Sequence, residues 1–300
     1  MSSLSTLHTS CTNQIELRAL TYNVDMAMRE QKVEMTKWGK RSARVRALVL
    51  DANPDFCCLQ ELRKLPGENP ITEFLSSFTG YDFEYGYRNS NELSFGQAIL
   101  FKPSKLYPME ISKKWLSDTP DTVSDTYSSD RQVGYLVLGV KFYHVVDGKI
   151  VTNKDPFWVF NTHYGLDEDL KTKSCHALLK IIKSVAKDTS FFLSGDFNFF
   201  PDRDGGLQRS VLTSEFDDLA KGAVTLGGKH VEGTFVGFDH DEFKADLNNM
   251  VSRLDHIFGK GLNASNPILY TKTMLDVEPP ELTTRDYPSD HLPLLITLNF

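Results

Sequence analysis

The sequence has few of the features that would assign a protein to a special class. It contains only four cysteines, Cys11, Cys57, Cys58 and Cys175. Two of them are adjacent, and a chain of 300 residues needs no covalent staple, so a disulfide framework is excluded. No window approaches about 18 uncharged apolar residues, and the Ser/Thr-rich start lacks the apolar segment of a secretory signal. We therefore expect a protein of a reducing compartment, cytoplasmic or nuclear, with no stable membrane insertion.

Positive charge is also scarce. The chain has 33 Lys and Arg against 40 Asp and Glu, for a formal net charge of -7, which argues against a broad grip on duplex nucleic acid. Repeats, low-complexity segments and dividing linkers are missing as well. Hydrophobic residues at 40% and charged residues at 24% are typical of a globular protein. We predict a disordered tail over residues 1–13 and a single domain, active as a monomer, over residues 14–300.

The sequence does contain alternating strand and helix patterns. Strands are indicated near 15–24 and 55–61, and amphipathic helices over 32–52 and 167–187. Further strands are predicted at 81–87, 97–102, 132–143, 156–163, 190–193, 254–258 and 292–299, with surface loops at 118–130, 201–206 and 227–246. Because strands outnumber helices and the helices are separated, the pattern favours a layered α/β architecture with two packed sheets.

Polar and acidic side chains recur where the predicted strands end. They are Asn23 and Asp25, Gln60 and Glu61, Asn161 and His163, Asp196 and Asn198, Asp255 and His256, and Ser289 to His291. Any one of them is typical of an ordinary turn, because short polar side chains bond their own backbone. Together they are typical of a ligand site, since sites in layered α/β folds collect at strand ends.

The segment around Asp196 carries the clearest single signal. An apolar strand runs into Gly195 and is followed by Asp196 and Asn198 between phenylalanines. Residues two apart on a strand point to the same face, so the carboxylate and the amide enter the same space. A simple turn would favour Asp-Gly or Asn-Gly order instead.

Glu61 indicates a metal site. It follows a buried apolar run, where an unpaired carboxylate is costly unless a cation or a group of donors compensates it. Mg2+ prefers oxygen ligands, which Glu61, Asn23, Asp25 and Asp290 can supply. The sequence has no Cys/His spacing for zinc. We therefore predict Mg2+, or Mn2+, as the cofactor.

His291 and Asp255 suggest a histidine whose ring is held in one orientation by a carboxylate. Ser289-Asp290-His291 places a histidine beside a carboxylate, and Asp255 is a candidate to fix the ring through its other nitrogen. A histidine held in this way can stabilise a phosphoryl transition state or take part in proton transfer.

In chain order these segments resemble the motif set of the endonuclease/exonuclease/phosphatase superfamily. The segments are Thr21 to Asp25, Leu59 to Glu61, Asn161 to His163, Gly195 to Asn198, Arg253 to Phe258, and Ser289 to His291. The resemblance spans residues 17–297 and implies a four-layered α/β/β/α sandwich with two packed mixed sheets. It also implies a metal-dependent phosphoric ester hydrolase, with Glu61 as principal metal ligand and Asn23, Asp25 and Asp290 in or near the metal shell.

The same resemblance implies catalytic roles for five residues. Asp196 would orient or deprotonate the attacking water, and Asn198 would bind a phosphate oxygen. His291, paired with Asp255, would contact the non-bridging phosphate oxygens. His163 matches a second histidine on the phosphate side. In-line attack on a phosphate needs a cation on one side, donors on the other and a base behind the water, which agrees with this assignment.

Two further sets are candidates for substrate contacts. Trp115 to Pro120 resembles an element of the small soluble branch of this superfamily, and Arg131, which comes next before a predicted strand, is a candidate to reach the phosphate together with Asn161. A basic helix face would either guide a polyanion or, as such faces more often do, simply meet solvent. Its residues are Lys37, Lys40, Arg41, Arg44 and Arg46.

Three functions follow from these residues. The leading hypothesis is a Mg2+-dependent phosphodiesterase, nuclease-like, whose substrate is a nucleic acid or a nucleotide-like diester. The second is a phosphomonoesterase or diesterase acting on a small sugar, lipid or inositol phosphate. The third is a catalytically silent binding module, which the presence of every expected acid, amide and histidine disfavours. Phe199-Phe200 after Asn198, and the missing Cys-Asp-Arg element at Arg253 to His256, differ from the inositol polyphosphate 5-phosphatase pattern.

Overall fold

The computed structural model describes most of the chain as two packed β-sheets with helices outside them. The described residues are 14–26, 37–63, 70–89, 94–123, 127, 135–200, 205–226, 228, 233–237, 252–271 and 287–300. The predicted tail at 1–13 and Arg131 lie outside these residues, and so do parts of the predicted loops at 118–130, 201–206 and 227–246.

Each sheet is mixed and has seven strands within the described residues. The first sheet has the order β11-β13-β14-β1-β2-β4-β3, with β1 (Glu16–Asn23), β2 (Phe56–Arg63), β3 (Asp82–Tyr87), β4 (Phe95–Phe101), β11 (Val224–Thr225), β13 (Asn263–Leu269) and β14 (Leu294–Asn299). The second has the order β10-β12-β9-β8-β6-β5, with β5 (Leu106–Trp115), β6 (Leu136–Val146), β8 (Phe157–His163), β9 (Phe191–Asp196), β10 (Asp217–Asp218) and β12 (Asp255–Lys260), and β7 (Lys149–Ile150) pairs with β6.

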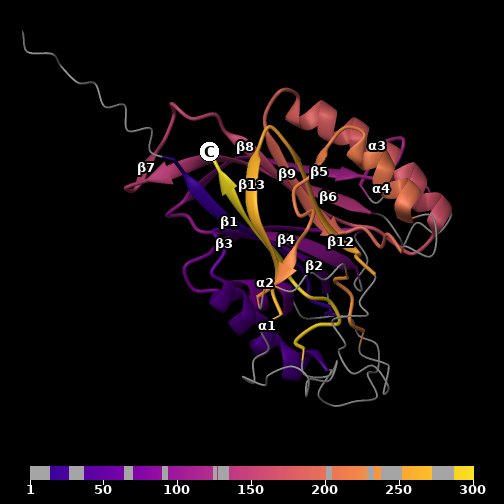
Figure 1. Cartoon of the computed structure of the whole chain (residues 1–300), viewed down its shortest axis with the longest axis horizontal. Helices are drawn as coiled ribbons and strands as arrows, with labels where there is room; N and C mark the ends of the chain where they lie inside the picture. Colours follow the sequence, from indigo (N-terminus) through magenta and orange to yellow (C-terminus); the bar gives the residue numbers. More distant parts are fainter. Residues whose placement is uncertain are drawn as a thin grey trace, which may run out of the picture.

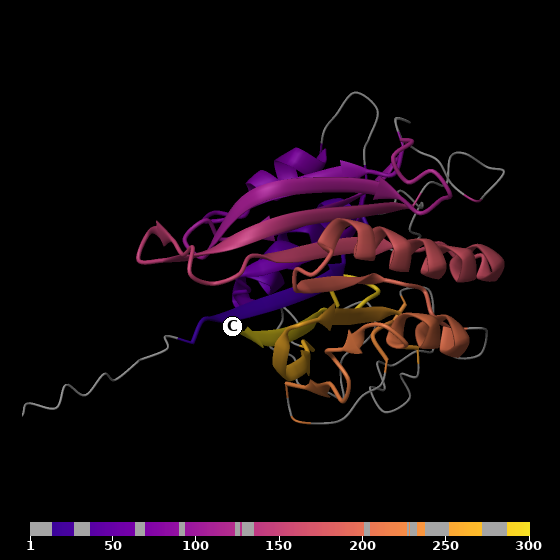
Figure 2. The ribbon, with the colours of Figure 1, turned by 90° about the horizontal axis from the view of Figure 1, so that it is seen from above.

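Helices cover the outer faces of the two sheets. Figure 1 shows α1 (Trp38–Ala52) and α2 (Pro70–Ser76) on one side of the strands, and α3 (Glu168–Ala186) and α4 (Gly205–Thr213) on the opposite side; the turned view of Figure 2 shows the same layering. Three apolar clusters occupy the three interfaces between these layers: one beneath α1 and α2, one between the sheets, and one beneath α3. The four-layered α/β/β/α prediction is confirmed. No described helix is long and apolar enough to cross a membrane.

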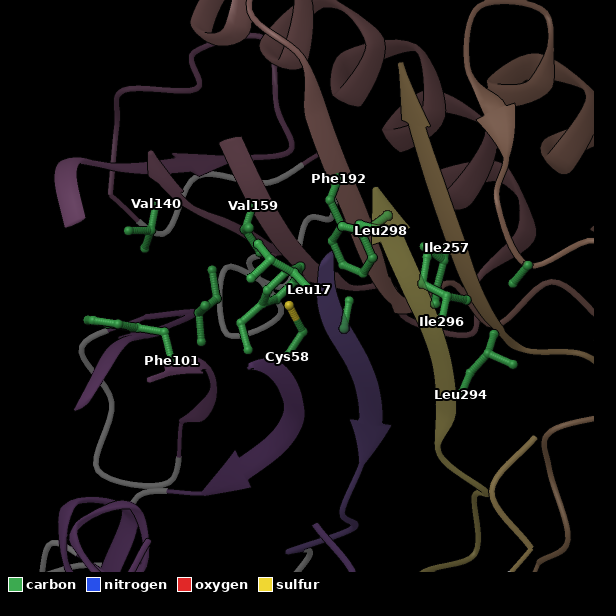
Figure 3. Close-up of a cluster of buried hydrophobic side chains, with 14 of the residues drawn as sticks. Leu17, Cys58, Phe101, Val140, Val159, Phe192, Ile257, Leu294, Ile296 and Leu298 are labelled. Atoms are coloured by element: carbon green, nitrogen blue, oxygen red, sulfur yellow. The ribbon is translucent and has the colours of Figure 1, made fainter. Parts of the chain in front are cut away.

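The central interface is built by alternating residues of both sheets. Figure 3 shows side chains of β1, β2 and β14, such as Leu17, Cys58 and Ile296, meeting Val159, Phe192 and others from the second sheet. These side chains are essentially inaccessible to solvent. Burial of apolar area contributes roughly 25 cal/mol per Å2, so this layer is a principal source of the stability that holds the two sheets together.

The pairing of strands brings the predicted site residues to one edge of the sandwich. β1 and β2 are parallel with Asn23 opposite Gln60, and β8 and β9 are parallel with His163 opposite Asp196. Parallel strands end at the same edge, so their terminal polar residues gather there. Gly195 is required just before Asp196, because a Cβ at this position would lie 1.9 Å from the carbonyl oxygen of Thr162.

Most of the predicted elements are present, and the missed ones have weak local patterns. α3 agrees with the helix predicted over 167–187. It begins after Asp167, whose side chain accepts from the Leu170 N–H at 3.0 Å and so caps the helix. The strand β5 was not predicted, because its apolar alternation is broken by a bulge near Pro108 and by exposed residues along the edge of the sheet. β13 is polar and only half-buried, and α4 is short; neither has a strong periodic signal.

Candidate active site

Asn23 lies at the centre of the site, where the two sheets meet. Its side chain is fully buried at the end of β1. Its Nδ2 donates to Glu61 Oε1 at 3.0 Å and to Asp196 Oδ2 at 2.9 Å, which joins a carboxylate of the first sheet to one of the second. Its Oδ1 accepts from the N–H of Asp25 at 3.0 Å. The structure therefore places Asn23 as a donor between two carboxylates, and its place in or near the metal shell stays a prediction.

Three site residues adopt an unusual backbone conformation. Asp25, Glu61 and Asn198 have φ values of 44°, 57° and 51° without being glycines. This region is uncommon for residues with a Cβ, although Asn and Asp enter it more readily. Such conformations persist only where the surrounding contacts impose them, and they cluster at functional sites. The strand ends are thus bent so that these three side chains turn into the same space.

The carboxylates on the first-sheet side form an anionic group that Arg41 offsets only in part. Burial, together with the negative charges of Asp290 and Glu61, raises the pKa of Asp25 to about 8. Burial and the charge of Asp290 also raise the pKa of Glu61, although the bond from Asn23 opposes the shift. Buried carboxylates such as Asp25 and Glu61, whose ionised forms burial and neighbouring charge disfavour, are groups that a hard divalent cation would neutralise. The residues Glu61, Asp25 and Asp290 therefore fit Mg2+ or Mn2+.

A second donor group shares Glu61. Ligand atoms of Glu61, His163 and Asp196 lie within 4.8 Å of one another. His163 Nε2 is 3.6 Å from Glu61 Oε1 and 3.5 Å from Asp196 Oδ2. The side chains gathered around Glu61, called the pocket below, thus include cation donors from both sheets.

Arg41 fixes the two loops that carry Asp25 and Asp290. Its guanidinium is fully buried and donates to the carbonyl oxygens of Val24, Asp25 and Pro288, with Nη2 also 3.6 Å from Asp25 Oδ2. The prediction that Arg41 belongs to a solvated basic face is therefore wrong. The helix face points one basic residue inward because the loop carbonyls need a donor that water does not supply. Lys37 and Lys40 are exposed, as predicted.

His291 is held by Asp255 as the sequence predicts. Its Nδ1 lies 2.7 Å from Asp255 Oδ2, and its Nε2 faces Asp196 Oδ2 at 3.7 Å. Burial alone would lower the pKa of His291, but the charges of Asp255 and Asp196 outweigh burial and raise it well above the usual value. His291 is therefore a charged donor that points into the pocket.

His163 has the opposite character. Burial lowers its pKa well below the usual value, and the positive charges of Arg88 and His291 lower it further. Its Nδ1 is buried with no partner among the described residues. Asn198 lies beside it, with Nδ2 3.5 Å from His163 Nε2 and bonded to the carbonyl of Tyr164 at 2.8 Å. His163 is therefore a neutral ring.

Asp196 lies between the two histidines. Burial is the main cause that raises its pKa to about 7, and the charge of His291 opposes the shift. Its Oδ1 accepts from the backbone N–H of Asn198 at 2.8 Å, which leaves Oδ2 toward Asn23 and the two rings. A carboxyl that titrates near neutral pH is suited to proton transfer.

Asn161 is not brought to the pocket. It is fully buried one step inside the sandwich, and its Nδ2 donates to the carbonyls of Leu59 and Ala98 at 2.9 Å each. Its Oδ1 accepts from Gln60 Nε2 at 2.8 Å. These bonds connect the two sheets, so Asn161 has a structural placement rather than the substrate contact that the sequence predicts. The other substrate candidate, Arg131, lies outside the described residues.

Two residues near the pocket were missed or misjudged by sequence reasoning. Arg88 follows β3 and donates from Nη2 to the carbonyl of His163 at 3.2 Å. Thr234 Oγ1 accepts from the N–H groups of Leu254 and Asp255 at 3.1 Å each and so supports the start of β12. The only sequence signal for Arg88 is that it is polar and follows a strand, which it shares with many turn residues.

Comparison with known proteins supports this reading of the fold. The Endonuclease/Exonuclease/phosphatase family model matches residues 20–291. An uncharacterized protein of Acanthamoeba polyphaga mimivirus is 28% identical over 284 residues, which cover 93% of this chain and 99% of that protein.

Two solved structures illustrate the similarity of fold. A mannosyl-6-phosphatase of Bacteroides thetaiotaomicron superposes with a TM-score of 0.75 at 22% identity, covering 95% of this chain and 100% of that one. ANGEL2, a 2′,3′-cyclic phosphatase in complex with adenosine-2′,3′-vanadate, superposes with a TM-score of 0.67 at 17% identity, covering 96% and 97%. The chain therefore belongs to the Endonuclease/Exonuclease/phosphatase family and is a phosphoester hydrolase.

Proposed function

We propose that the protein is a Mg2+-dependent phosphodiesterase, nuclease-like, that hydrolyses its substrate by in-line attack of an activated water. Members of the family are phosphoester hydrolases that generally depend on a divalent metal. The observation that carries the proposal is the position of Asp196, whose Oδ2 accepts from Asn23 at 2.9 Å and lies 3.7 Å from His291 Nε2. The carboxylate of Asp196 thus lies between Asn23, which orients the proposed metal ligand Glu61, and the protonated ring of His291.

Three side chains of this protein have separate roles in the proposed reaction. Asp196 accepts the proton of the attacking water, since its pKa of about 7 makes it partly ionised at neutral pH. His291, kept protonated by Asp255, donates to the non-bridging phosphate oxygens as negative charge builds up. Asn198 is the neutral donor beside it.

The metal side is formed by Glu61, Asp25 and Asp290, with Asn23 orienting Glu61. When bound, Mg2+ or Mn2+ would polarise a phosphate oxygen and stabilise the leaving oxygen. Arg41 donates to the carbonyls of both loops and so fixes the position of Asp25 relative to the loop that carries Asp290.

A phosphomonoesterase or a diesterase of a small sugar, lipid or inositol phosphate is the second candidate. It is favoured by the fold similarity to a mannosyl-6-phosphatase and by a net charge of -7, which suits a compact phosphate better than a long polyanion. We further propose a cytoplasmic or nuclear location, because the three described cysteines, Cys57, Cys58 and Cys175, are free and buried.

A substrate panel separates these candidates. Single-stranded and duplex DNA, RNA, nucleotide diesters and sugar or inositol phosphates would be tested with Mg2+, with Mn2+ and with EDTA. We expect diester hydrolysis that EDTA abolishes and either metal restores, and loss of turnover in Glu61→Gln. Turnover of monoesters alone would select the second candidate, and EDTA-insensitive turnover would contradict the metal mechanism.

A further inference from the structure

Arg88 is a buried cation at the pocket that the proposed mechanism does not use. It follows β3 and is only 7% exposed. Its N–H donates to the carbonyl of Phe95 at 2.9 Å, and its own carbonyl accepts from Trp115 Nε1 at 2.6 Å. The backbone at Arg88 is thus held by both neighbouring parts of the fold, β4 and β5.

The guanidinium of Arg88 is oriented but has few hydrogen-bond partners. It lies over the rings of Phe95 and Tyr135, 5.4 Å and 5.3 Å from their centroids. Nη2 donates to the carbonyl of His163 at 3.2 Å, while Nε is buried with no partner among the described residues. A guanidinium carries five N–H donors, so most of its capacity is unused within the described part of the chain.

Arg88 differs from the other buried cations of the molecule. Arg41 lies 3.6 Å from Asp25 and Lys171 lies 2.7 Å from Glu168, and the partly buried Arg253 lies 3.0 Å from Asp218. Among the described residues, Arg88 has no carboxylate within ion-pair distance. A buried charge without a partner is strongly destabilising, so its retention calls for an anion that arrives from outside.

The pocket is where that anion would bind. Arg88 holds the carbonyl of His163, whose ring faces Glu61 and Asp196. The charge of Arg88 acts on both of these carboxylates. The guanidinium therefore lies on the β3 and β8 side of the pocket, whereas His291 enters from the β12 and β14 side.

We propose that Arg88 binds a non-bridging oxygen of the substrate phosphate, opposite His291. The inference rests on the proposed function, because it assigns a second cationic contact to the same phosphate. The forked donors of arginine match the geometry of phosphate oxygens, and aromatic stacking holds the fork in place before substrate arrives. The phosphate would supply the negative charge that the described residues do not.

The test compares Arg88→Met with Arg88→Lys and with Arg63→Met. Arg63 is the matched control, because its guanidinium lies 5.0 Å from the centroid of the same Phe95 ring. For Arg88→Met we expect KM for the substrate and the inhibition constant of inorganic phosphate to rise about 30-fold, in the range of a lost charge-assisted bond. Arg88→Lys should fall between, and Arg63→Met should stay within about twofold of the wild type.

Two readouts distinguish phosphate binding from a merely structural role. Binding of Mn2+, followed by its electron paramagnetic resonance, should be unchanged in Arg88→Met. Added guanidinium ion should restore phosphate affinity to Arg88→Met but leave Arg63→Met unaffected, because only the first variant has lost a guanidinium at the phosphate.

The outcomes separate this inference from the proposed function. If the wild type hydrolyses no phosphoester, the proposed function fails. If the wild type is active and folded Arg88→Met keeps the wild-type inhibition constant for phosphate, the role of Arg88 is overturned while the proposed function stands. If Arg88→Met does not fold, Arg88→Lys decides, and a wild-type inhibition constant in that variant would overturn the role.

Discussion

The two sides of the pocket each contribute a buried histidine, and the two rings carry opposite charge. On the β12 and β14 side, the carboxylate of Asp255 lies 2.7 Å from His291 and keeps that ring protonated. On the β3 and β8 side, His163 lies near the cation Arg88 and remains neutral. Burial disfavours the charged form of both rings. It prevails at His163, with Arg88 and His291 adding to it, whereas the charges of Asp255 and Asp196 outweigh it at His291.

This contrast shows how one residue type can serve two purposes in a small space. A protonated ring donates to developing negative charge, whereas a neutral ring can lie near a cation or accept a proton. Asp196 is shared, since its Oδ2 lies 3.5 Å from His163 and 3.7 Å from His291. The two sides of the pocket therefore differ in charge, with the protonated His291 on one side and the neutral His163 on the other.

Removing the carboxylate that both sides share should have the largest effect. We expect Asp196→Asn to lower kcat by about 10^3-fold, because proton transfer from the attacking water is lost. The fold should be retained, since the substitution is nearly isosteric and removes a buried carboxyl whose pKa is raised to about 7. Steady-state kinetics and circular dichroism check this, with exposed Asp217→Asn as the control. Turnover within tenfold of the wild type would contradict the assignment.

Replacing the partner of one histidine should erase the contrast between the two sides. Asp255→Asn removes the charge that raises the pKa of His291, so the ring should lose its proton at lower pH. We expect kcat to fall about 10- to 100-fold and the basic limb of the kcat profile to move to lower pH. Imidazole NMR shifts would report the His291 pKa directly, with His163 as an internal reference that stays neutral. An unshifted profile would show that Asp255 does not control this ring.

The smallest effect should appear in stability rather than activity. The folded-state pKa values of about 8 for Asp25 and about 7 for Asp196 lie above the ordinary value of about 4. The folded protein therefore binds these protons more tightly than the unfolded chain. The stability they contribute is fully present below about pH 4 and is lost as pH rises from there through the folded-state values of about 7 and about 8. Metal-free protein should lose about 5 °C in Tm between about pH 5 and about pH 8.

A divalent metal should remove most of that loss. Saturating Mg2+ compensates the ionised carboxylates of the first-sheet side, so the Tm of the loaded protein should depend less on pH. Asp25→Asn should flatten the metal-free profile in calorimetry. A metal-free Tm that rises with pH would contradict the anionic cluster.

Much of the layered fold could be predicted from the local pattern of apolar and polar residues. Whether a given polar side chain is buried between the sheets or reaches the pocket could not. Asn161 and His163 lie two apart on β8 and so share a face, yet His163 reaches the pocket while Asn161 is bonded between the sheets. Their environments differ because the opposing strands β2 and β4 cover one position and not the next. Arg41 was misjudged for the same reason, since the carbonyls that bind it come from loops as far away as Pro288.

The sequence by itself determined the order of the motifs, the strands that end in acids, amides and histidines, and the oxygen-rich chemistry of a metal site. These are local properties, set by residue type and by the alternation of side chains along a strand. Only the tertiary structure decided that Asn23 joins Glu61 to Asp196, that His291 is charged and His163 neutral, and that Arg88 binds the carbonyl of His163 with no carboxylate within ion-pair distance among the described residues. Protonation and pairing depend on burial and on charges brought together from distant segments, which no local pattern contains.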